Sequence, residues 1–180
     1  ARALVRAMEL AEPGDVGHAQ RVDEYSSAVA ARMGLPPEKI EKIQLAALLH
    51  DIGKVATRRP DSAVPPDQLK AQHVFAGEKI LAGAEGVEDI LPGIRYHHER
   101  ADGSGFPYHR KNADTPLMAR VIIATNAFDS ASSSGGVPFG EAARILAAGR
   151  GKEFDEDVVK ALLACHDDGS LYVSLPAPPA

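Results

Sequence analysis

Apolar residues recur at steps of three and four positions through almost all of this 180-residue chain, and this spacing constrains its fold most. Such steps place apolar side chains on one face of an α-helix, whereas a strand requires alternation, and no convincing strand pattern is present. The periodic segments, which Pro and Gly residues separate, predict helices over residues 2–11, 18–33, 38–52, 67–81, 87–99, 116–129, 140–148 and 155–165. We therefore predict an all-α protein, a single helical bundle of about seven or eight helices.

Composition and charge narrow the class of protein. The chain has 20 Lys and Arg against 25 Asp and Glu, a formal net charge of −5, which argues against a nucleic acid polymer as partner. Its single cysteine, Cys165, excludes an intramolecular disulfide and favours a reducing, cytoplasmic location. No apolar run approaches the ~20 residues of a membrane span, so we expect no membrane segment within this chain.

The same patterns set the expected domain limits. The helical pattern predicts one domain over residues 1–166. Residues 167–180 carry no apolar period and are predicted to be a poorly ordered C-terminal tail.

The histidines share helical faces with apolar residues. The chain has 7 histidines, and those on or beside an apolar stripe are His18, His50, His73, His97 and His98. A lone histidine on such a stripe is more often a hydrogen-bonded core residue than a metal ligand, and His18 or His73 alone would favour that interpretation. Adjacent pairs differ, because neighbours on a helix diverge by about 100° and only one can lie at the stripe centre. The pairs His50–Asp51 and His97–His98 therefore indicate a site wide enough for two metal ions.

Asp51 strengthens this hypothesis. A carboxylate buried beside an apolar run costs several kcal/mol unless a cation compensates, so ALLHDIGK is a poor sequence for a plain core helix. Lys54, one turn after His50, is one candidate for that cation.

Five motifs follow one another along the chain: HAQRV at 18–22, LLHDIGK at 48–54, H-x-x-x-G at 73–77, HHERADGSGFP at 97–107 and ARVIIATNAFD at 119–129. In this order they resemble the motifs of the HD superfamily, and more narrowly those of its HD-GYP branch. The resemblance covers residues 1–165. It implies a metal-dependent phosphodiesterase domain of the HD type, usually acting on the bacterial second messenger cyclic di-GMP and often fused to sensory or receiver domains.

The resemblance also implies a role for individual residues. Asp51 would bridge two divalent transition-metal ions, with iron or manganese favoured and zinc as an alternative. The implied metal ligands are His18, His50, Asp51, His73, His97, His98 and Asn126. Catalytic roles are implied for Asp51 and Lys54, and substrate binding for Lys54, Arg100, Asp102, Gly103, Ser104 and Gly105. A hydroxide shared by the two ions would attack phosphorus, while Lys54 offsets charge on the phosphoryl oxygens.

The chain departs from the family pattern at several positions. Phe106 replaces the family's Tyr and loses only a hydroxyl group. Asn126 replaces an aspartate ligand, and an uncharged amide oxygen binds a transition metal more weakly. Gly14 stands where family members with a third metal often have a glutamate. No Lys or Arg occurs between residues 130 and 143, where the family often has basic residues for substrate phosphate.

These observations leave three hypotheses, in this order. The first is a phosphodiesterase that hydrolyses cyclic di-GMP, or a related cyclic dinucleotide, to the linear dinucleotide or GMP. The second is a degenerate signalling or binding module with little or no turnover, which Asn126 and the uncharged segment favour. The third is an HD-type phosphohydrolase of another nucleotide. Other signalling domains or proteins, and a second copy of the chain, are further potential partners.

Overall fold

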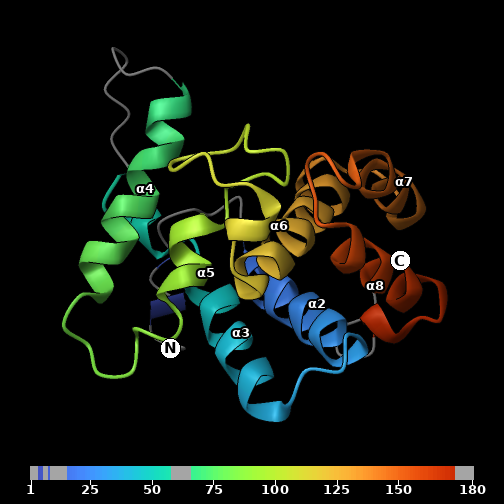
Figure 1. Ribbon diagram of the computed structural model, residues 1–180, viewed down its shortest axis with the longest axis horizontal. Helices are drawn as coiled ribbons and strands as arrows, with labels where there is room; N and C mark the ends of the chain where they lie inside the picture. Colours follow the sequence, from blue (N-terminus) through green and yellow to red (C-terminus); the bar gives the residue numbers. More distant parts are fainter. Residues whose placement is uncertain (1–3, 6–7, 9–15, 58–65, 173–180) are drawn as a thin grey trace.

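The described chain is built of α-helices (Figure 1). The computed structural model describes residues 4–5, 8, 16–57 and 66–172. Seven α-helices lie within the described residues: α2 (His18–Arg32), α3 (Pro37–Leu49), α4 (Pro66–Leu81), α5 (Leu91–Tyr96), α6 (Leu117–Asp129), α7 (Phe139–Gly149) and α8 (Glu156–Asp167). The β-structure described there consists of two isolated bridges, Asp102–Lys111 and Arg150–Phe154. The predicted all-α fold is therefore confirmed.

Two predicted helices end differently from expectation. Helix α3 stops at Leu49 rather than at residue 52, and Ile52–Val55 form a 3₁₀ turn, η2. This tighter turn brings Gly53 against the backbone of α4. Helix α5 occupies only Leu91–Tyr96 of the predicted range 87–99, with a proline in its first turn. In both cases a histidine, His50 or His97, immediately follows the end of the helix.

The segment after α6 also differs from the prediction. Ser130–Ser134, which lie beyond the predicted helix over residues 116–129, continue α6 as a π-helical turn, η4. Residues 167–172, predicted as part of the tail, complete α8 and form a 3₁₀ turn, η5 (Ser170–Tyr172), because Leu171 packs into the core and is 2% exposed. The predicted helix over residues 2–11, the position of Gly14 and residues 173–180 lie largely or wholly outside the described residues.

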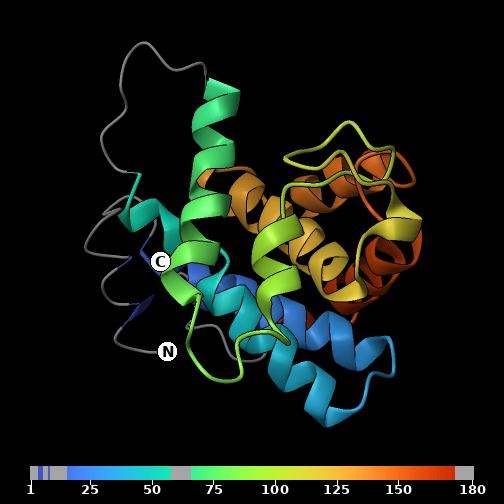
Figure 2. The ribbon, with the colours of Figure 1, turned by 60° about the vertical axis from the view of Figure 1, so that its left-hand side comes forward.

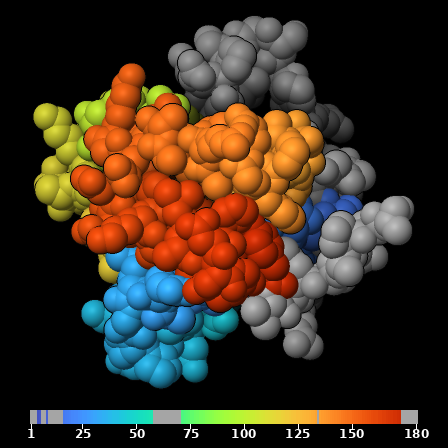
Figure 3. All heavy atoms as spheres, turned by 90° about the vertical axis from the view of Figure 1, so that its right-hand side faces the viewer, coloured from blue at the N-terminus to red at the C-terminus, as the bar shows by residue number. Residues whose placement is uncertain are grey.

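Helix α2 lies at the centre of the arrangement, in contact with α3, α6 and α8. Figures 1 and 2 show α4 at one end, beside α5, and α7 with α8 at the other. Figure 3 shows α7 and α8 covering the face of that second end. None of the described helices combines the length and the apolarity that a membrane span requires.

Two groups of buried apolar residues support this arrangement. One joins α2, α6, α7 and α8 around Tyr25, Phe128 and Leu162. The other joins α3, α4 and α5 around Leu49, Ile90 and Ile94. The polar cluster described below comes from the ends of α3 and α5, from the interior of α4 and from the start of α2.

Candidate metal centre

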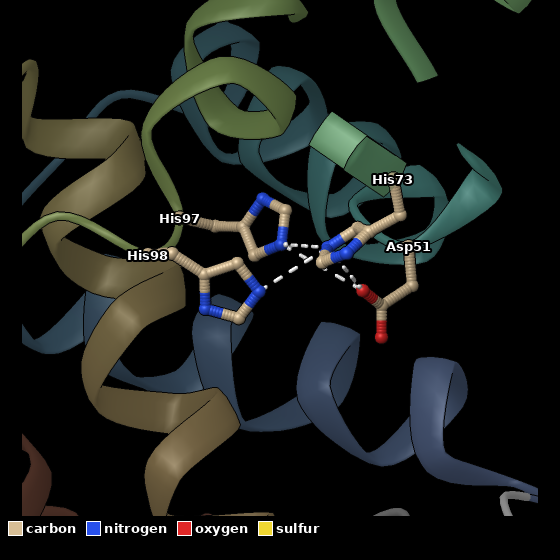
Figure 4. Close-up of side chains that lie close together, drawn as sticks. All are labelled: Asp51, His73, His97 and His98. Carbon is tan, nitrogen blue, oxygen red and sulfur yellow. Dashed lines mark hydrogen bonds and ion pairs between the residues drawn. The ribbon is translucent and has the colours of Figure 1, made fainter. Parts of the chain in front are cut away.

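Helix ends and one helix interior deliver the histidines to a single place. His18 begins α2, His50 and Asp51 follow α3, His73 lies within α4, and His97 and His98 follow α5. Ligand-type atoms form two groups, each within 4.8 Å: Asp51, His73, His97 and His98, and His18, His50 and Asp51. All six histidine and aspartate residues that the sequence singled out thus come together (Figure 4 shows four of them).

Asp51 belongs to both groups, with one carboxylate oxygen toward each. Its Oδ1 lies 3.3 Å from Nε2 of His73 and 3.6 Å from Nε2 of His97. Its Oδ2 lies 3.3 Å from Nε2 of His50 and 3.8 Å from Nε2 of His18. A carboxylate that faces two separate sets of imidazole nitrogens has the geometry of a bridging ligand between two cations.

Hydrogen bonds from the outer ring nitrogens to backbone carbonyls fix the orientation of two imidazoles, those of His50 and His97. Nδ1 of His50 donates to the carbonyl of Ala47, and Nδ1 of His97 to that of Ile94, each at 2.7 Å. Because a carbonyl only accepts, each Nδ1 carries a hydrogen, and in the neutral imidazole Nε2 is then a lone pair on the side of Asp51. The buried Nε2 of His50 makes no hydrogen bond with the described residues. Such an orphaned lone pair fits a metal ion, whose ligands are oriented in this way.

The imidazole nitrogens also converge on one another. Nε2 of His73 lies 3.0 Å from Nε2 of His97 and 3.2 Å from Nε2 of His98. Three nitrogens at this spacing, beside an anionic oxygen, match the mixed imidazole and carboxylate ligands that iron, manganese or zinc accept. The donor set therefore fits a transition metal.

Burial and charge set the protonation states of the cluster. Burial raises the pKa of Asp51, but His50, with His73 and His97, outweighs it and lowers that pKa well below its ordinary value. Burial lowers the pKa of His97 to about 4, and burial with neighbouring imidazoles lowers the pKa of His98. Burial also opposes charge on His50, yet Asp51 outweighs it and raises the pKa of His50. An ionised Asp51 and neutral His97 and His98 are the forms that bind metal.

Lys54 is the cation beside Asp51. Its Nζ lies 2.7 Å from Oδ2 of Asp51, and its side chain is 33% exposed. The sequence-based expectation that Lys54 compensates this carboxylate agrees with the contact. The Lys54 side chain is thus partly exposed at the edge of the cluster.

Asp129 and Arg21 support His18, and sequence reasoning assigned neither of them this role. Asp129 is 0% exposed, and its Oδ2 accepts a hydrogen bond from Nδ1 of His18 at 2.7 Å. Arg21 donates to both oxygens of the same carboxylate, at 2.6 and 3.1 Å. Burial raises the pKa of Asp129, but His18 and Arg21 outweigh it and lower that pKa. The sequence signal for a shared partner was the spacing of His18 and Arg21, which lie one helical turn apart on the same face of α2.

Asn126 lies on α6, one turn before Ser130, whose hydroxyl donates to its amide oxygen at 3.4 Å. Among the described residues, no hydrogen bond joins this amide to the histidine cluster. Asn126 precedes Asp129 by three positions and so shares its side of the helix. The implied role of Asn126 as a ligand stays a prediction.

The loop after His98 has structural contacts of its own. Arg100 donates to Glu153 at 2.9 Å, and Asp102 accepts from the backbone N–H of Ser104 at 2.8 Å. Gly103 has a φ of 83°, which favours glycine. These contacts tie residues 100–104 to their own turn and to the segment before α8 rather than to the cluster. Substrate binding by Arg100, Asp102, Gly103, Ser104 and Gly105 stays a prediction.

The fold and the site together define a helical protein with a histidine and aspartate cluster suited to divalent metal ions. The sequence model described as HD domain matches residues 2–158, and the chain belongs to this family.

Relatives support the narrower resemblance. The cyclic di-GMP phosphodiesterase response regulator RpfG of Xanthomonas campestris is 33% identical over 177 residues, covering 89% of this chain and 46% of that protein. The 3'3'-cGAMP-specific phosphodiesterase 2 of Vibrio cholerae is 32% identical over 188 residues, covering 96% of this chain and 36% of that protein. The structure of Bd1817, an HDG"Y"P protein from Bdellovibrio bacteriovorus, matches with a TM-score of 0.70 at 25% identity, covering 83% of this chain and 51% of that one. The resemblance to the HD-GYP branch is confirmed, and the chain spans about half the length of these relatives or less.

Proposed function

We propose that this chain is a metal-dependent phosphodiesterase domain that hydrolyses a cyclic dinucleotide. The substrate is cyclic di-GMP or 3'3'-cGAMP, the molecules in the names of its relatives. Hydrolysis adds one water to each P–O bond cleaved, giving first the linear dinucleotide and then mononucleotides. The observation that carries the proposal is Asp51, whose two oxygens face two separate sets of imidazole nitrogens.

The proposed ligands of two divalent transition-metal ions are His18, His50, Asp51, His73, His97 and His98, with Asn126 as a further candidate. When bound, the ions would supply Lewis-acid stabilisation of the phosphoryl oxygens and a water of lowered pKa. Iron or manganese is proposed first and zinc second, because imidazole and carboxylate suit all three.

Side chains of the protein itself would orient the ions and the substrate phosphate. In their neutral forms His50 and His97 present Nε2 as a lone pair of fixed direction, because their outer nitrogens donate to backbone carbonyls. Lys54 holds a positive charge at the edge of the cluster, where it would donate to a non-bridging phosphoryl oxygen. Asp51 stays ionised because the surrounding imidazoles lower its pKa.

A second candidate function, a binding module without turnover, rests on a different observation. Asn126 offers an amide in place of a carboxylate, and residues 130–143 contain no Lys or Arg to hold a substrate phosphate. Such a protein would bind the dinucleotide and release it unchanged. Hydrolysis of another nucleotide is the remaining alternative.

Metal content and turnover together test the proposal. Protein purified without chelator is analysed for iron, manganese and zinc, and is then incubated with cyclic di-GMP or 3'3'-cGAMP while linear dinucleotide and mononucleotides are followed. Asp51→Asn is the variant, and Asp89→Asn is the control, because Asp89 is an exposed carboxylate in one ion pair with Lys42. We expect about two equivalents of metal and turnover in the wild-type and control proteins, with both lost in Asp51→Asn.

The alternatives give different results. Binding of either dinucleotide without product supports the binding module. Turnover of other nucleotides, without turnover of either cyclic dinucleotide, supports an HD-type phosphohydrolase of another nucleotide. A metal-free wild-type protein with full helical content contradicts the metal-dependent function.

A further inference from the structure

Glu99 is a buried carboxylate next to the histidine pair, and it accepts two backbone hydrogen bonds. Its side chain follows His98 and is 1% exposed. One oxygen accepts from the N–H of Tyr108 and the other from the N–H of Arg110, each at 2.8 Å. A buried carboxylate is costly unless such charge-assisted hydrogen bonds satisfy it. Glu99 therefore draws the far side of the loop back to the end of α5.

Two further contacts close the same loop. The N–H of Phe106 donates to the carbonyl of His98 at 3.1 Å. A Cβ at Gly105 would lie 2.4 Å from the nitrogen of Arg100 and 2.5 Å from Cα of Glu99, so glycine is required for this approach. The loop therefore closes at Gly105, at Phe106 and at the Glu99 carboxylate.

This closure places the Phe106 ring on the imidazole of His98. The two ring centroids are 4.7 Å apart and the planes differ by 22°, a stacked arrangement. No Nδ1 hydrogen bond to the described residues orients His98, in contrast to His50 and His97. The Phe106 ring thus restricts the plane of the His98 imidazole, whereas the backbone carbonyls fix both the orientation and the tautomer of His50 and His97. With the ring held in this way, Nε2 of His98 faces Nε2 of His73 at 3.2 Å.

We infer that Glu99 is a positioning residue, which acts through the loop and Phe106 to hold His98 in the orientation needed for a metal ligand. The inference rests on the proposed metal-dependent function. Glu99 would support one of the two ligand groups, that of Asp51, His73, His97 and His98. The orientation of His18 and His50, in the other ligand group, would not depend on Glu99.

Ring currents give a test that needs no metal. Because Phe106 stacks on His98, the His98 ring protons of the wild-type protein should resonate upfield of their ordinary position. A spectrum of His98→Ala assigns them. In Glu99→Gln the amide has only one acceptor oxygen, and its NH₂ group faces the second backbone N–H. We expect the His98 shift to become smaller in this variant, as it should in Phe106→Leu, while the part that comes from the His97 ring, whose centroid lies 4.1 Å away, remains. Glu153→Gln is the control, because Glu153 pairs with Arg100 in the same region but does not hold the loop closed.

Metal titration then separates positioning from general stability. Zinc is titrated into the chelator-treated wild-type protein, the Glu99→Gln variant and the Glu153→Gln control. We expect Glu99→Gln to lower the affinity for one of the two ions about 10- to 100-fold and to leave the other within a factor of about three, as expected for loss of an outer-sphere support. Adding Phe106→Leu to Glu99→Gln should cause no further loss, because both changes act through the same ring.

Several outcomes overturn the inference. They are an unchanged His98 shift in Glu99→Gln, equal weakening of both ions, or additive losses in the double variant. If Glu99→Gln does not fold, two other variants replace it, Phe106→Leu and Glu99→Asp. Aspartate has a shorter side chain, which breaks at least one of the two hydrogen bonds. The expected readouts are the same. A wild-type protein that binds none of iron, manganese and zinc contradicts the proposed function, whereas the His98 shift still decides the role of Glu99.

Discussion

Nδ1 of His18 lies 2.7 Å from Oδ2 of Asp129, although the two residues are 111 positions apart in the sequence. The hydrogen bond joins the start of α2 to the end of α6. It fixes the tautomer of His18 and turns Nε2 toward Asp51. Arg21 offsets the charge of the same buried carboxylate. The contact explains how a histidine at a helix start is held in an orientation suited to metal binding.

Asp129→Asn should weaken one metal site selectively. The amide keeps a hydrogen-bond acceptor for His18 but removes the negative charge that Arg21 and His18 share. We expect the affinity of the ion held by His18, His50 and Asp51 to fall about 10- to 100-fold. Titration with zinc and elemental analysis measure this. The matched control is Asp89→Asn, and equal affinities in the two variants would contradict the role of Asp129.

Asn126→Asp should have the opposite effect. Asn126 shares a side of α6 with Asp129, and a carboxylate binds a transition metal more strongly than an amide does. We expect metal occupancy to rise when protein is purified from the same culture medium. Gln72→Glu, at an exposed position of α4, adds the same charge elsewhere and serves as the control. If occupancy does not change, Asn126 is not a ligand.

Lys54→Gln should lower turnover while metal remains bound. Loss of the ammonium group removes a charge-assisted hydrogen bond to the substrate phosphate, for which we expect a fall of about 100-fold in kcat/KM. Metal content measured on the same samples separates this effect from loss of the ions. Lys42→Gln is the control, because Lys42 is an exposed lysine whose ion pair is with Asp89. Unchanged kcat/KM would remove Lys54 from the catalytic machinery.

Gly53→Ala should disrupt the site through packing. A Cβ at Gly53 would lie 1.8 Å from the carbonyl oxygen of His73 and 2.6 Å from the nitrogen of Gly77, so α4 must move. We expect a loss of about 3 kcal/mol in the free energy of unfolding, measured by urea denaturation, together with loss of metal.

Gly140→Ala is the matched control for this substitution. A Cβ at Gly140 would meet nothing within 4 Å, and the residue lies in α7. Alanine should there leave stability unchanged or raise it by about 0.5–1 kcal/mol. Equal stabilities of the two variants would show that the approach of η2 to α4 is not tight.

The sequence predicted the fold class and the cluster because both depend on local patterns. Helical periodicity depends on spacing within one segment, and the motifs around His50, His73 and His97 carry their chemistry in a few adjacent positions. Helix ends were less predictable. The 3₁₀ turn after α3 arises because Gly53 packs against α4, and the π turn after α6 continues the helix past residue 129, where the predicted helix ends.

The sequence by itself thus determined an all-α chain with six histidine and aspartate residues suited to metal, and these come together as expected. Only the tertiary structure decided how each of them is oriented. The two oxygens of Asp51 face different imidazole sets because α3 ends at Leu49, and η2 then turns the carboxylate between α2, α4 and α5. Asp129 supports His18, and Glu99 supports the loop over His98, through hydrogen bonds. The residue types alone do not indicate which partners these two carboxylates bind. Such contacts depend on the packing of distant helices, which no local pattern encodes.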